Sequence, residues 1–530
     1  MPTVLATTET QRLAEQQRLD ALKDADERNW WGQFATPPQL ALDIAQYARS
    51  LWPVETGTPV KFLDPAIGTG SFYSAVRQVF PERLLDCAAG IELDPLFVAS
   101  ARSLWNASGL QVRHADFTSL RPSGHFNLLI SNPPYVRHHH VTAEEKERLQ
   151  SEVRQELGIS ISGLAGYYCY FLLLADKWLA PGGLSIWLIP SEFMGVNYGV
   201  AVKEYLKKQV TLLHVHRFCP SDVQFSDALV SSAIVVFRKA PPPRNHNVMF
   251  SFGGSLNTPQ QQRLISLKKL HVRDKWTRFP AQDSTDAGDH RRVALGDLFT
   301  IKRGLATGNN GFFVLPKSRA EQLGIPTQCC RPILPSPRYL RQSVVESRQD
   351  GYPNLDEPLA LIDCDLPEDE IRRNFPDFWR YLQQGQEQQV HEGYLASRRT
   401  PWYSQEKRDP AAFLCTYMGR STDKRAGSPF RFIWNKSKAT AANVYLMLYP
   451  KPALQQQLTS DPQLYGRIYD GLTRVPVSQF LDEGRVYGGG LYKLEPKELG
   501  RVSADEIVRV IDHVSLPRQR QLFGCERGQA

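Results

Sequence analysis

The eight cysteines of this 530-residue chain show no C-x-x-C pair and no ordered Cys/His spacing. A disulfide framework and a structural zinc site are therefore not expected, and a reducing compartment, the cytoplasm, is the default location. The chain also lacks a long apolar run, because its most apolar stretch, residues 167–190, is cut by Asp176, Lys177 and a Pro-Gly-Gly turn. Residues 1–20 are polar and show no apolar core of a secretory signal. No membrane partner is expected.

A strong charge of one sign is absent as well. Lys and Arg number 63 against 55 Asp and Glu, which gives a formal net charge of +8 and a pI near 8.9. This balance is compatible with a polyanionic partner but does not require one. With 42% hydrophobic and 22% charged residues the composition is that of a globular protein. Disorder throughout is therefore excluded, and two or three domains are expected.

The most informative segment, Ser131 to Tyr135, reads Ser-Asn-Pro-Pro-Tyr and directly follows the apolar run of residues 126–130. A buried strand that ends in this way places the segment at the carboxyl edge of a sheet, where α/β enzymes hold their substrates. The prolines fix the direction of the Pro133 carbonyl, and the Asn132 side chain adds a second acceptor. Tyr135 offers a flat face for a planar base. The segment therefore suits an exocyclic amine on an aromatic ring, and a Pro-Pro turn that only closes a strand is the alternative.

Three more predicted strand ends carry residues suited to a ligand. Residues 61–72 read as a strand, a glycine turn and the start of a helix, an arrangement that brings backbone close to a ligand. The turn lacks the Lys-Ser/Thr of a nucleoside triphosphate P-loop, and it is not the dinucleotide G-x-G-x-x-G. The next strand ends at Glu92, in the place where an acid accepts hydrogen bonds from both ribose hydroxyls. Asp116 ends the third strand and suits an adenine amine, with Phe117 packed on the ring.

The chain resembles the TaqI-like branch of the gamma class of DNA adenine-N6 methyltransferases in the order of its motifs, which are Thr36-Pro37, Asp64-Pro65-Ala66-x-Gly68-x-Gly70, Glu92, Asp116-Phe117 and Asn132-Pro133-Pro134-Tyr135. The resemblance implies an α/β fold, in which a Rossmann-like methyltransferase domain with a mixed seven-stranded sheet precedes a carboxyl-terminal α+β target-recognition domain. It implies S-adenosyl-L-methionine as cofactor and double-stranded DNA as partner, with the target adenine flipped out of the duplex. The enzyme would be the modification half of a restriction-modification or related defence system. A separate cognate restriction endonuclease stays open, and a monomer or weak dimer is expected.

The resemblance also assigns roles to single residues. The implied catalytic residues are Asn132, Pro133, Pro134, Tyr135 and Phe225, with Phe225 facing the flipped adenine from the side opposite Tyr135. The implied cofactor-binding residues are Thr36, Pro37, Asp64, Ala66, Gly68, Gly70, Glu92, Asp116, Phe117 and Asn132. From the residues alone, Thr36 also suits the N-cap of a helix that runs to about residue 51, and Phe225 also suits a core position beside a strand.

Composition divides the chain into four parts. Residues 1–29 predict a weakly amphipathic amino-terminal helical extension, and residues 30–243 the methyltransferase domain, in which residues 167–190 read as a helix, a turn and a buried strand. A proline-rich break and a polar stretch bound a connector, residues 244–290, with one helix at residues 259–270. A further domain is expected at residues 291–530. Its opening and its glycine-rich segment at residues 485–496 resemble those of TaqI-like enzymes, which implies that it is the DNA target-recognition domain.

Cations, aromatics and amides alternate along residues 397–408, and the basic character continues through Lys424 and Arg425 to residue 438. Cations suit phosphates, while Arg, Asn and Gln can read base edges. We therefore expect a DNA face that includes Arg398, Arg399, Trp402, Tyr403, Lys407, Arg408, Asn435, Lys436 and Lys438. A solvated charged surface is the alternative.

The sequence leaves other functions as alternatives. The run of three histidines at residues 138–140 has no carboxylate or Cys partner at ligand spacing, so no metal is expected. Asn-Pro-Pro-Tyr also occurs in enzymes that methylate protein glutamine, and similar motifs occur in RNA methyltransferases. An RNA or protein substrate is therefore the first alternative. The methylase part of a fused restriction enzyme and a non-catalytic DNA-binding subunit are the others. DNA adenine methylation is favoured by the Thr36-Pro37 element, the large carboxyl-terminal domain and the intact Asn-Pro-Pro-Tyr motif.

Overall fold

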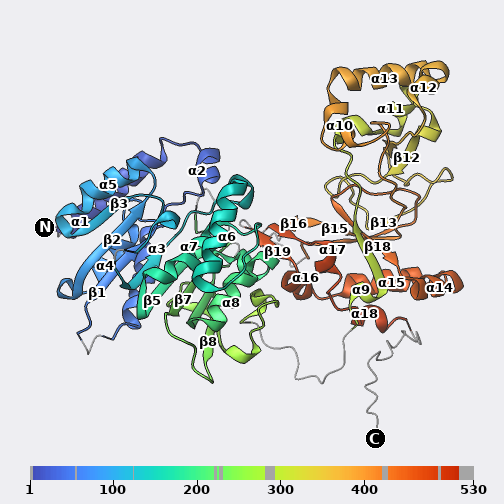
Figure 1. Ribbon diagram of the computed structural model, residues 1–530. Helices are drawn as coiled ribbons and strands as arrows, with labels where there is room; N and C mark the ends of the chain where they lie inside the picture. Colours follow the sequence, from blue (N-terminus) through green and yellow to red (C-terminus); the bar gives the residue numbers. More distant parts are fainter. Residues whose placement is uncertain are drawn as a thin grey trace, which may run out of the picture. The chain divides into compact units, whose positions relative to one another are not determined.

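Figure 1 shows the computed structural model, which describes residues 4–53, 57–122, 124–219, 222, 224–225, 231–280, 293–420, 428–487 and 491–511. The chain divides into two compact units, residues 1–286 with 486–490, and residues 287–485 with 491–530. Among the described residues, no helix combines the length and the apolar character needed to cross a bilayer.

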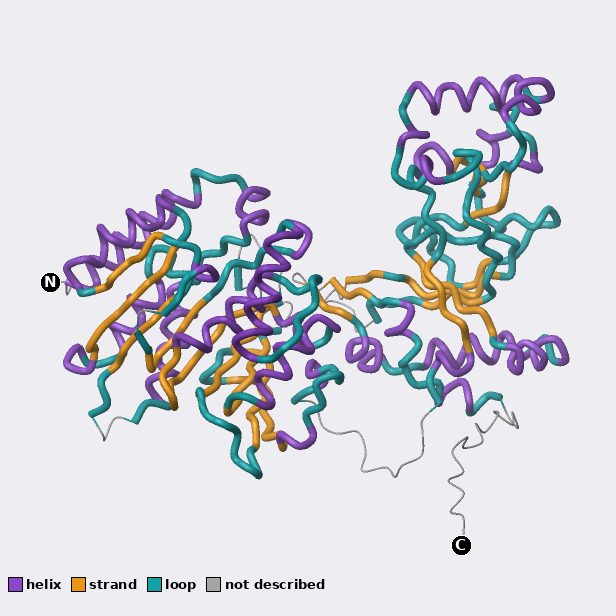
Figure 2. The backbone as a smooth tube through the Cα atoms, viewed as in Figure 1, coloured by secondary structure: helices purple, strands orange, loops and turns teal. Residues whose placement is uncertain are grey.

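A nine-stranded mixed sheet forms the centre of the first unit, in the order β3-β2-β1-β4-β5-β7-β6-β8-β9 (Figure 2). Its strands are β1 (Val60–Asp64), β2 (Leu85–Glu92), β3 (Leu110–His114), β4 (Phe126–Ser131), β5 (Leu179–Pro190), β6 (Thr211–Arg217), β7 (Ser232–Arg238), β8 (Asn247–Gly254) and β9 (Pro259–Ser266). Strands β1 to β5 run parallel, and β7 is antiparallel to both of its neighbours. The central strands read as continuous apolar runs because both of their faces are buried, as for residues 128–130 of β4.

The strand order reverses between β1 and β4, because the chain builds β2 and β3 on one side of β1 and then crosses to the other side. In open parallel sheets ligands bind at such a switch point, beyond the carboxyl ends of the strands. β1, β2 and β4 end at Asp64, Glu92 and Ser131, and Asp116 follows β3. The parallel pairing therefore brings these polar residues to one edge of the sheet, as the sequence predicts.

Two groups of helices flank this sheet. The helices α1 (Val4–Asp20), α3 (Pro38–Ser50), α4 (Ser71–Val79) and α5 (Pro95–Trp105) pack against one another, and so do α6 (Ala143–Leu157), α7 (Tyr167–Leu174) and α8 (Val200–Lys208). A short helix, α2 (Ala25–Trp31), follows α1. Helix α7 and strand β5 confirm the helix and buried strand expected between residues 167 and 190.

Three features of the first unit differ from the expectations. The amino-terminal segment forms two helices, because Asp24 caps a new helix at Ala25. The helix expected at residues 259–270 is wrong, since residues 259–266 form β9 and pair antiparallel with β8 along its length. The sheet therefore has nine strands, with the two additional ones supplied by the segment expected to be a connector. An unpaired edge on β8 outweighs the helix preference of Gln, Leu and Lys in that segment.

The second unit is an α+β domain built on a five-stranded sheet, in the order β10-β18-β15-β17-β13. These strands are β10 (Phe299–Arg303), β13 (Val344–Val345), β15 (Phe413–Thr416), β17 (Phe432–Asn435) and β18 (Tyr445–Pro450). One hydrophobic core of this unit joins the sheet to the helices α9 (Leu295–Leu298), α14 (Pro452–Ser460), α15 (Leu464–Arg474), α16 (Val477–Glu483), α17 (Pro496–Leu499) and α18 (Asp505–Val508).

A three-stranded sheet and a pair of strands complete the second unit. The sheet β11 (Val314–Pro316), β14 (Leu359–Ile362), β12 (Cys330–Ile333) shares a separate core with α10 (Asn310–Phe313), α11 (Lys317–Gln322), α12 (Glu368–Asn374) and α13 (Pro376–Glu387) (Figure 1). In the pair, β16 (Met418–Arg420) runs antiparallel to β20 (Leu491–Lys493). A further short strand, β19, spans Arg485–Tyr487.

Candidate functional site

A cavity of about 350 Å³ lies at the edge of the first unit where β1, β2 and β4 end. Most of the residues that the sequence assigns to the cofactor and to catalysis line it, namely Thr36, Asp64, Ala66, Gly68, Glu92, Asp116, Phe117, Asn132 and Pro134. The other assigned residues lie outside its lining, and these are Pro37, Gly70, Pro133, Tyr135 and Phe225. The predicted residues at the ends of the strands therefore lie together at one cavity, and part of the predicted catalytic residues lie outside its lining.

Glu92 is held in place by the backbone around it. Its Oε1 accepts hydrogen bonds from the N–H groups of Leu93 and Asp94, both at 2.9 Å, and its Oε2 accepts from Gly68 N at 3.0 Å. A carboxylate has about four acceptor sites, so three are filled and one remains for a ligand. Burial raises the pKa of Glu92. The carboxylate is thus suited to accept a hydrogen bond from a ribose, and the contact to both ribose hydroxyls stays a prediction.

Asp64 links the glycine turn to the Ser-Asn-Pro-Pro-Tyr segment, residues 131–135, which we call the corner. Its Oδ1 accepts from Ser131 Oγ at 2.8 Å and from Ala66 N at 3.0 Å. The side chain is buried, and this burial raises the pKa of Asp64 to about 7. The ends of β1 and β4 are therefore joined by a buried hydrogen bond directly beneath the cavity.

Gly70 packs behind the glycine turn, and its predicted contact with the cofactor is untested. It caps α4 with φ +89°, and a Cβ at this position would lie 2.4 Å from Trp105 Nε1. The Trp105 indole N–H also donates to the carbonyl of Thr69 at 2.8 Å. Gly70 therefore makes room for this tryptophan behind the turn and does not line the cavity.

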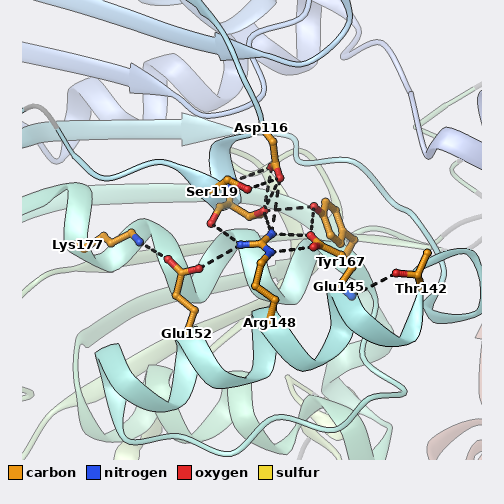
Figure 3. A network of polar contacts seen from close by, with 9 residues as sticks. Asp116, Ser119, Thr142, Glu145, Arg148, Glu152, Tyr167 and Lys177 are labelled. Atoms are coloured by element: carbon orange, nitrogen blue, oxygen red, sulfur yellow. Dashed lines mark hydrogen bonds and ion pairs between the residues drawn. The ribbon is translucent and has the colours of Figure 1, made fainter.

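Asp116, which follows β3, forms a polar network with residues of α6 (Figure 3). Its carboxylate accepts from Thr118 N and Oγ1 and from Ser119 Oγ, each at 2.9 Å, and lies 3.7 Å from Arg148 Nη2. Arg148 also pairs with Glu145 at 2.5 Å. The Asp116 carboxylate is thus oriented by its neighbours and largely occupied by them, which the sequence does not reveal.

Phe117 forms an apolar wall beside this network. It is buried, and its ring centroid lies 5.1 Å from that of Phe171, which also lines the cavity. Tyr167 lies between the wall and the network, with its hydroxyl 3.4 Å from Glu145 Oε1. A planar ring system fits beside Phe117 and Phe171 with polar groups at its edge, as an adenine requires.

Asn132 has one end of its amide satisfied and the other end without a partner. Its Nδ2 donates to the carbonyl of Phe34 at 2.9 Å and contacts Thr36 Oγ1 at 3.2 Å. Its Oδ1 is buried and has no hydrogen-bond partner among the described residues. Because the two donor contacts fix the orientation of the amide, the unpaired atom is an acceptor. Thr36 therefore helps to orient the Asn132 amide, and the N-cap residue of α3 is Pro37 and not Thr36.

The loop before α3 lies directly against the corner. Gly32 accepts a hydrogen bond from Tyr135 N at 2.9 Å. Gly32 has φ +61°, and a Cβ at this position would lie 2.4 Å from the backbone of Tyr135, so only glycine allows this approach. In the described part of the chain no hydrogen bond reaches the carbonyl of Pro133. That carbonyl and Asn132 Oδ1 are therefore two acceptors on adjacent residues.

Three aromatic rings pack behind the corner. The ring of Tyr135 meets that of Phe225 edge to face, with centroids 5.9 Å apart and planes at 85°. Phe34 contacts both rings, at 5.6 and 5.7 Å. A base between two faces would need centroids about 7 Å apart, because each stacking contact takes about 3.5 Å. The rings of Tyr135 and Phe225 thus contact each other in the structure, and their placement on opposite sides of a flipped adenine stays a prediction.

Several lining residues were missed by the sequence analysis. Gln16 and Asp20 of α1 line the cavity, although the sequence suggests only an amino-terminal extension. Trp30 of α2 stacks on His140 with centroids 3.9 Å apart and planes at 16°, and both residues line the cavity. The half-exposed Trp30-Trp31 pair was the available signal, since large aromatics at a surface mark interaction sites. No local pattern marks Gln16.

The predicted DNA-contacting residues of the second unit fall into two groups. Four cations have exposed side chains, which are Arg398, Lys407, Lys436 and Lys438. Lys407 and the half-buried Arg408 line a cavity of about 290 Å³ together with Lys302. These positions are accessible to a phosphate backbone.

The other group supports the interior of the second unit. Tyr403 is fully buried, and its hydroxyl donates to the carbonyl of Leu366 at 2.6 Å. Asn435 is buried and donates to the carbonyl of Ala439 at 2.9 Å. Arg399 donates to the carbonyls of Ala306 and Thr307, and Trp402 packs against Phe312. Burial corrects the expectation that Tyr403 and Asn435 face DNA, because alternating polar and aromatic residues fit a domain interior equally well. Lys424, Arg425 and the triple glycine at 488–490 lie outside the described residues.

Comparisons with known proteins agree with this geometry. The family described as the Eco57I restriction-modification methylase matches residues 92–224, and the family described as the carboxyl-terminal domain of the type II methyltransferase M.Eco57I matches residues 284–527. The type II methyltransferase M.XamI of Xanthomonas campestris pv. amaranthicola is 29% identical over 467 residues, 85% of this chain and 81% of the relative. M.AccI of Acinetobacter calcoaceticus is 24% identical over 492 residues, 90% of this chain and 85% of the relative. The chain is thus similar along most of its length to type II restriction-modification methyltransferases.

A solved structure shows the fold. The type IIL restriction-modification enzyme MmeI, determined in complex with DNA, aligns with a TM-score of 0.53 at 13% identity and covers 86% of this chain and 67% of that chain. The first unit has the class I S-adenosylmethionine-dependent methyltransferase fold, and a carboxyl-terminal domain follows it, which confirms the predicted fold class. The cofactor is S-adenosylmethionine. The residues of the cavity fit it, because Glu92 has acceptor capacity for a hydroxyl and Phe117 offers a face for adenine.

Proposed function

We propose that this relative of the type II restriction-modification methyltransferases transfers a methyl group from S-adenosylmethionine to N6 of adenine in duplex DNA. The observation that carries the proposal is the buried, unpartnered Oδ1 of Asn132. An unpaired buried acceptor costs about 1–3 kcal/mol, so its retention at a cavity wall is explained by a donor that arrives with the substrate. An exocyclic amine of a base is such a donor.

The proposed catalysis depends on positioning. Asn132 Oδ1 and the Pro133 carbonyl would accept hydrogen bonds from the two N6 hydrogens, which directs the nitrogen lone pair away from the ring plane and toward the methyl group. As N6 bonds to the methyl carbon, the S–CH3 bond would break with its electron pair left on the sulfur of S-adenosylhomocysteine, and N6 would release one proton. The cofactor supplies that methyl group already activated on a sulfonium, so neither a metal nor a covalent enzyme intermediate is needed. Asp64 and Ser131 keep the corner in register with the glycine turn. Correct placement of the two reactants is the largest contribution that such a site can make.

Adenine within a duplex has to leave the stack before its N6 can reach Asn132, at a cost of a few kcal/mol. The aromatic rings of Phe34, Tyr135 and Phe225 lie directly behind the corner and are suited to hold the flipped base. Because Tyr135 and Phe225 contact each other in the structure, the base has to separate them or stack on one side of the group. The exposed cations of the second unit would bind the DNA backbone.

The test is expression in a bacterial host that lacks DNA methylation, followed by single-molecule sequencing and mass spectrometry of the nucleosides. We expect N6-methyladenine at one short repeated sequence, and none in cells that express Asn132→Ala at the same level. N4-methylcytosine would overturn the choice of base and leave DNA methylation in place. Unmodified DNA, with transfer of a labelled methyl group to RNA or to protein glutamine, would overturn the proposal.

A further inference from the structure

The two amino-terminal helices are tied to the cofactor side of the first unit by buried polar contacts. Arg12 of α1 is 1% exposed, and its guanidinium forms two hydrogen bonds with Glu9, at 2.6 and 2.8 Å. The third nitrogen donates to Thr69 Oγ1, in the glycine turn, at 3.1 Å. Glu9 also accepts a hydrogen bond from Ser74 of α4. Burying an arginine is unfavourable unless it is fully paired, so these contacts indicate a fixed position for α1.

The carboxyl-terminal turn of α1 reaches the cavity itself. Gln16 accepts from Thr69 Oγ1 at 2.7 Å and donates to Asp20 Oδ1 at 2.8 Å, and both Gln16 and Asp20 line the cavity. Thr69 follows Gly68, whose N–H donates to Glu92. The end of α1 therefore lies beside the turn that holds the ribose-binding carboxylate.

A second attachment lies on the other side of Glu92. Lys23, between α1 and α2, forms an ion pair with Asp94 Oδ2 at 2.6 Å and donates to Gln33 Oε1 at 2.7 Å. Its side chain is 16% exposed and that of Asp94 is 14% exposed, so this ion pair is largely shielded from solvent. Asp94 stands two residues after Glu92 and donates its N–H to the Glu92 carboxylate. The glycine turn and Asp94, which both donate backbone N–H groups to Glu92, are thus contacted by the same amino-terminal segment.

We propose that α1 and α2 form one wall of the cofactor site, in which Gln16 and Asp20 contact the ribose end of S-adenosylmethionine and Lys23 is a positioning residue. The Glu92 carboxylate already accepts three backbone N–H groups. The Asp20 carboxylate, which Gln16 contacts, lines the cavity beside the same turn and adds a second acceptor for the hydroxyls of a ribose. The inference rests on the cofactor of the proposed function and not on the base that is methylated.

The chain offers closely matched controls on the same helix. Gln16 lines the cavity, whereas its neighbour Gln17 is exposed, so Gln17→Ala controls for Gln16→Ala. Arg18 is exposed and pairs only along the helix with Glu15, so Arg18→Met controls for Lys23→Met. Lys23→Arg retains a cation that can reach Asp94.

The experiment measures equilibrium binding of S-adenosylmethionine and of 5′-methylthioadenosine, which keeps the ribose and lacks the amino-acid end. We expect Gln16→Ala and Asp20→Ala to weaken both ligands by the same factor, about five- to tenfold for a lost hydrogen bond, and Gln17→Ala to bind like wild type. Loss for S-adenosylmethionine alone would overturn placement at the ribose end. Wild-type affinity in both variants would overturn the inference as a whole.

Lys23 needs readouts that separate positioning from general stability. Lys23→Met should raise KM for the cofactor about fivefold with kcat and DNA affinity unchanged, and Lys23→Arg should restore most of the loss. A fall in Tm and in DNA affinity with no change in KM would assign Lys23 to stability alone and overturn its positioning role. If the wild-type protein binds no S-adenosylmethionine, the proposed function fails. If the wild type binds it and these variants do so equally well, only this inference fails.

Discussion

The side-chain amide of Asn132 donates a hydrogen bond to the main-chain carbonyl of Phe34 at 2.9 Å. This bond connects the corner after β4 to the loop before α3, 98 residues away in sequence. It fixes the orientation of the amide, because the nitrogen is occupied and the oxygen is left as an acceptor without a partner among the described residues.

Asn132→Ala should lower the single-turnover rate of methyl transfer by at least about 10²-fold, since it removes an acceptor that acts on the reacting nitrogen. Asn132→Asp should also be impaired, because a carboxylate cannot donate to Phe34. Rapid-quench assays with a labelled methyl group measure both rates. Cofactor affinity, from fluorescence titration, should stay within about threefold of wild type. A normal rate in Asn132→Ala would remove this residue from the mechanism.

Tyr135→Ala should weaken binding of the flipped base by about 1–3 kcal/mol, the range for base–aromatic stacking. Tyr135→Phe is the matched control, because it keeps the ring and removes only the hydrogen bond to the carbonyl of Leu188 at 3.1 Å. A duplex with 2-aminopurine at the target position reports flipping by its fluorescence. Equal fluorescence gains in wild type, Tyr135→Ala and Tyr135→Phe would show that Tyr135 does not hold the base.

Asp64 should make the stability of the first unit depend on pH. Its pKa is raised from 3.8 to about 7 by burial, so between about pH 4 and pH 7 the folded chain keeps a proton that the unfolded chain has released. The free energy of unfolding therefore falls as pH rises through this window, by about 4 kcal/mol at most. Asp64→Asn keeps an acceptor for Ser131 and Ala66 and does not titrate.

The measurement for Asp64 is thermal unfolding of wild type and Asp64→Asn at several pH values. The Tm of the variant minus that of the wild type should increase from pH 5 to pH 7.5. Parallel Tm curves over this range would contradict a raised pKa at Asp64.

Arg148→Met should raise KM for the cofactor about two- to fivefold with little change in kcat, because Arg148 orients Asp116 through a partly exposed ion pair at 3.7 Å. Arg148→Lys should recover part of the loss, since lysine supplies the charge without the planar fork. Arg154 lies on the exposed side of the same helix, so Arg154→Met is the control. Identical steady-state constants for Arg148→Met and Arg154→Met would exclude this role.

Lys438→Ala should weaken DNA binding uniformly across sequences and reduce the slope of log affinity against log salt by about one. Tyr403→Phe should leave DNA binding unchanged and lower the free energy of unfolding by about 1 kcal/mol, because its buried hydroxyl bonds to Leu366. Fluorescence anisotropy at several salt concentrations and chemical denaturation separate the two effects. The opposite pattern would place Tyr403 on the DNA face and Lys438 away from it.

The sequence predicted those parts of the site that follow from local pattern. Asp64, Glu92 and Asn132 each stand at or directly after the end of an apolar strand, and parallel pairing alone brings such residues to one edge. What each side chain bonds to could not be predicted. The Asp116 carboxylate is occupied by Thr118 and Ser119, and nothing in the spacing of these residues shows whether their hydroxyls turn toward it.

Long-range contacts explain the remaining differences. Gln16 meets Thr69 across 53 residues, and no helical periodicity marks it as a cavity residue. Residues 259–266 have helix-forming composition, yet the free edge of β8 makes them a strand. Tyr403 lies in a cationic segment that suggests DNA, while its ring completes a hydrophobic core. In each case a tertiary contact or strand pairing, which the local sequence does not show, outweighs the local preference.

All residues that line the 350 Å³ cavity lie between positions 16 and 171. Recombination between related genes with a crossover after residue 283 would therefore exchange the whole segment matched by the carboxyl-terminal methyltransferase family, residues 284–527, and leave every residue that lines this cavity unchanged. If the exchanged segment selects the DNA target, as proposed, one genetic step changes the target while the cavity is inherited intact. Chimeras built at this junction would test that division of roles.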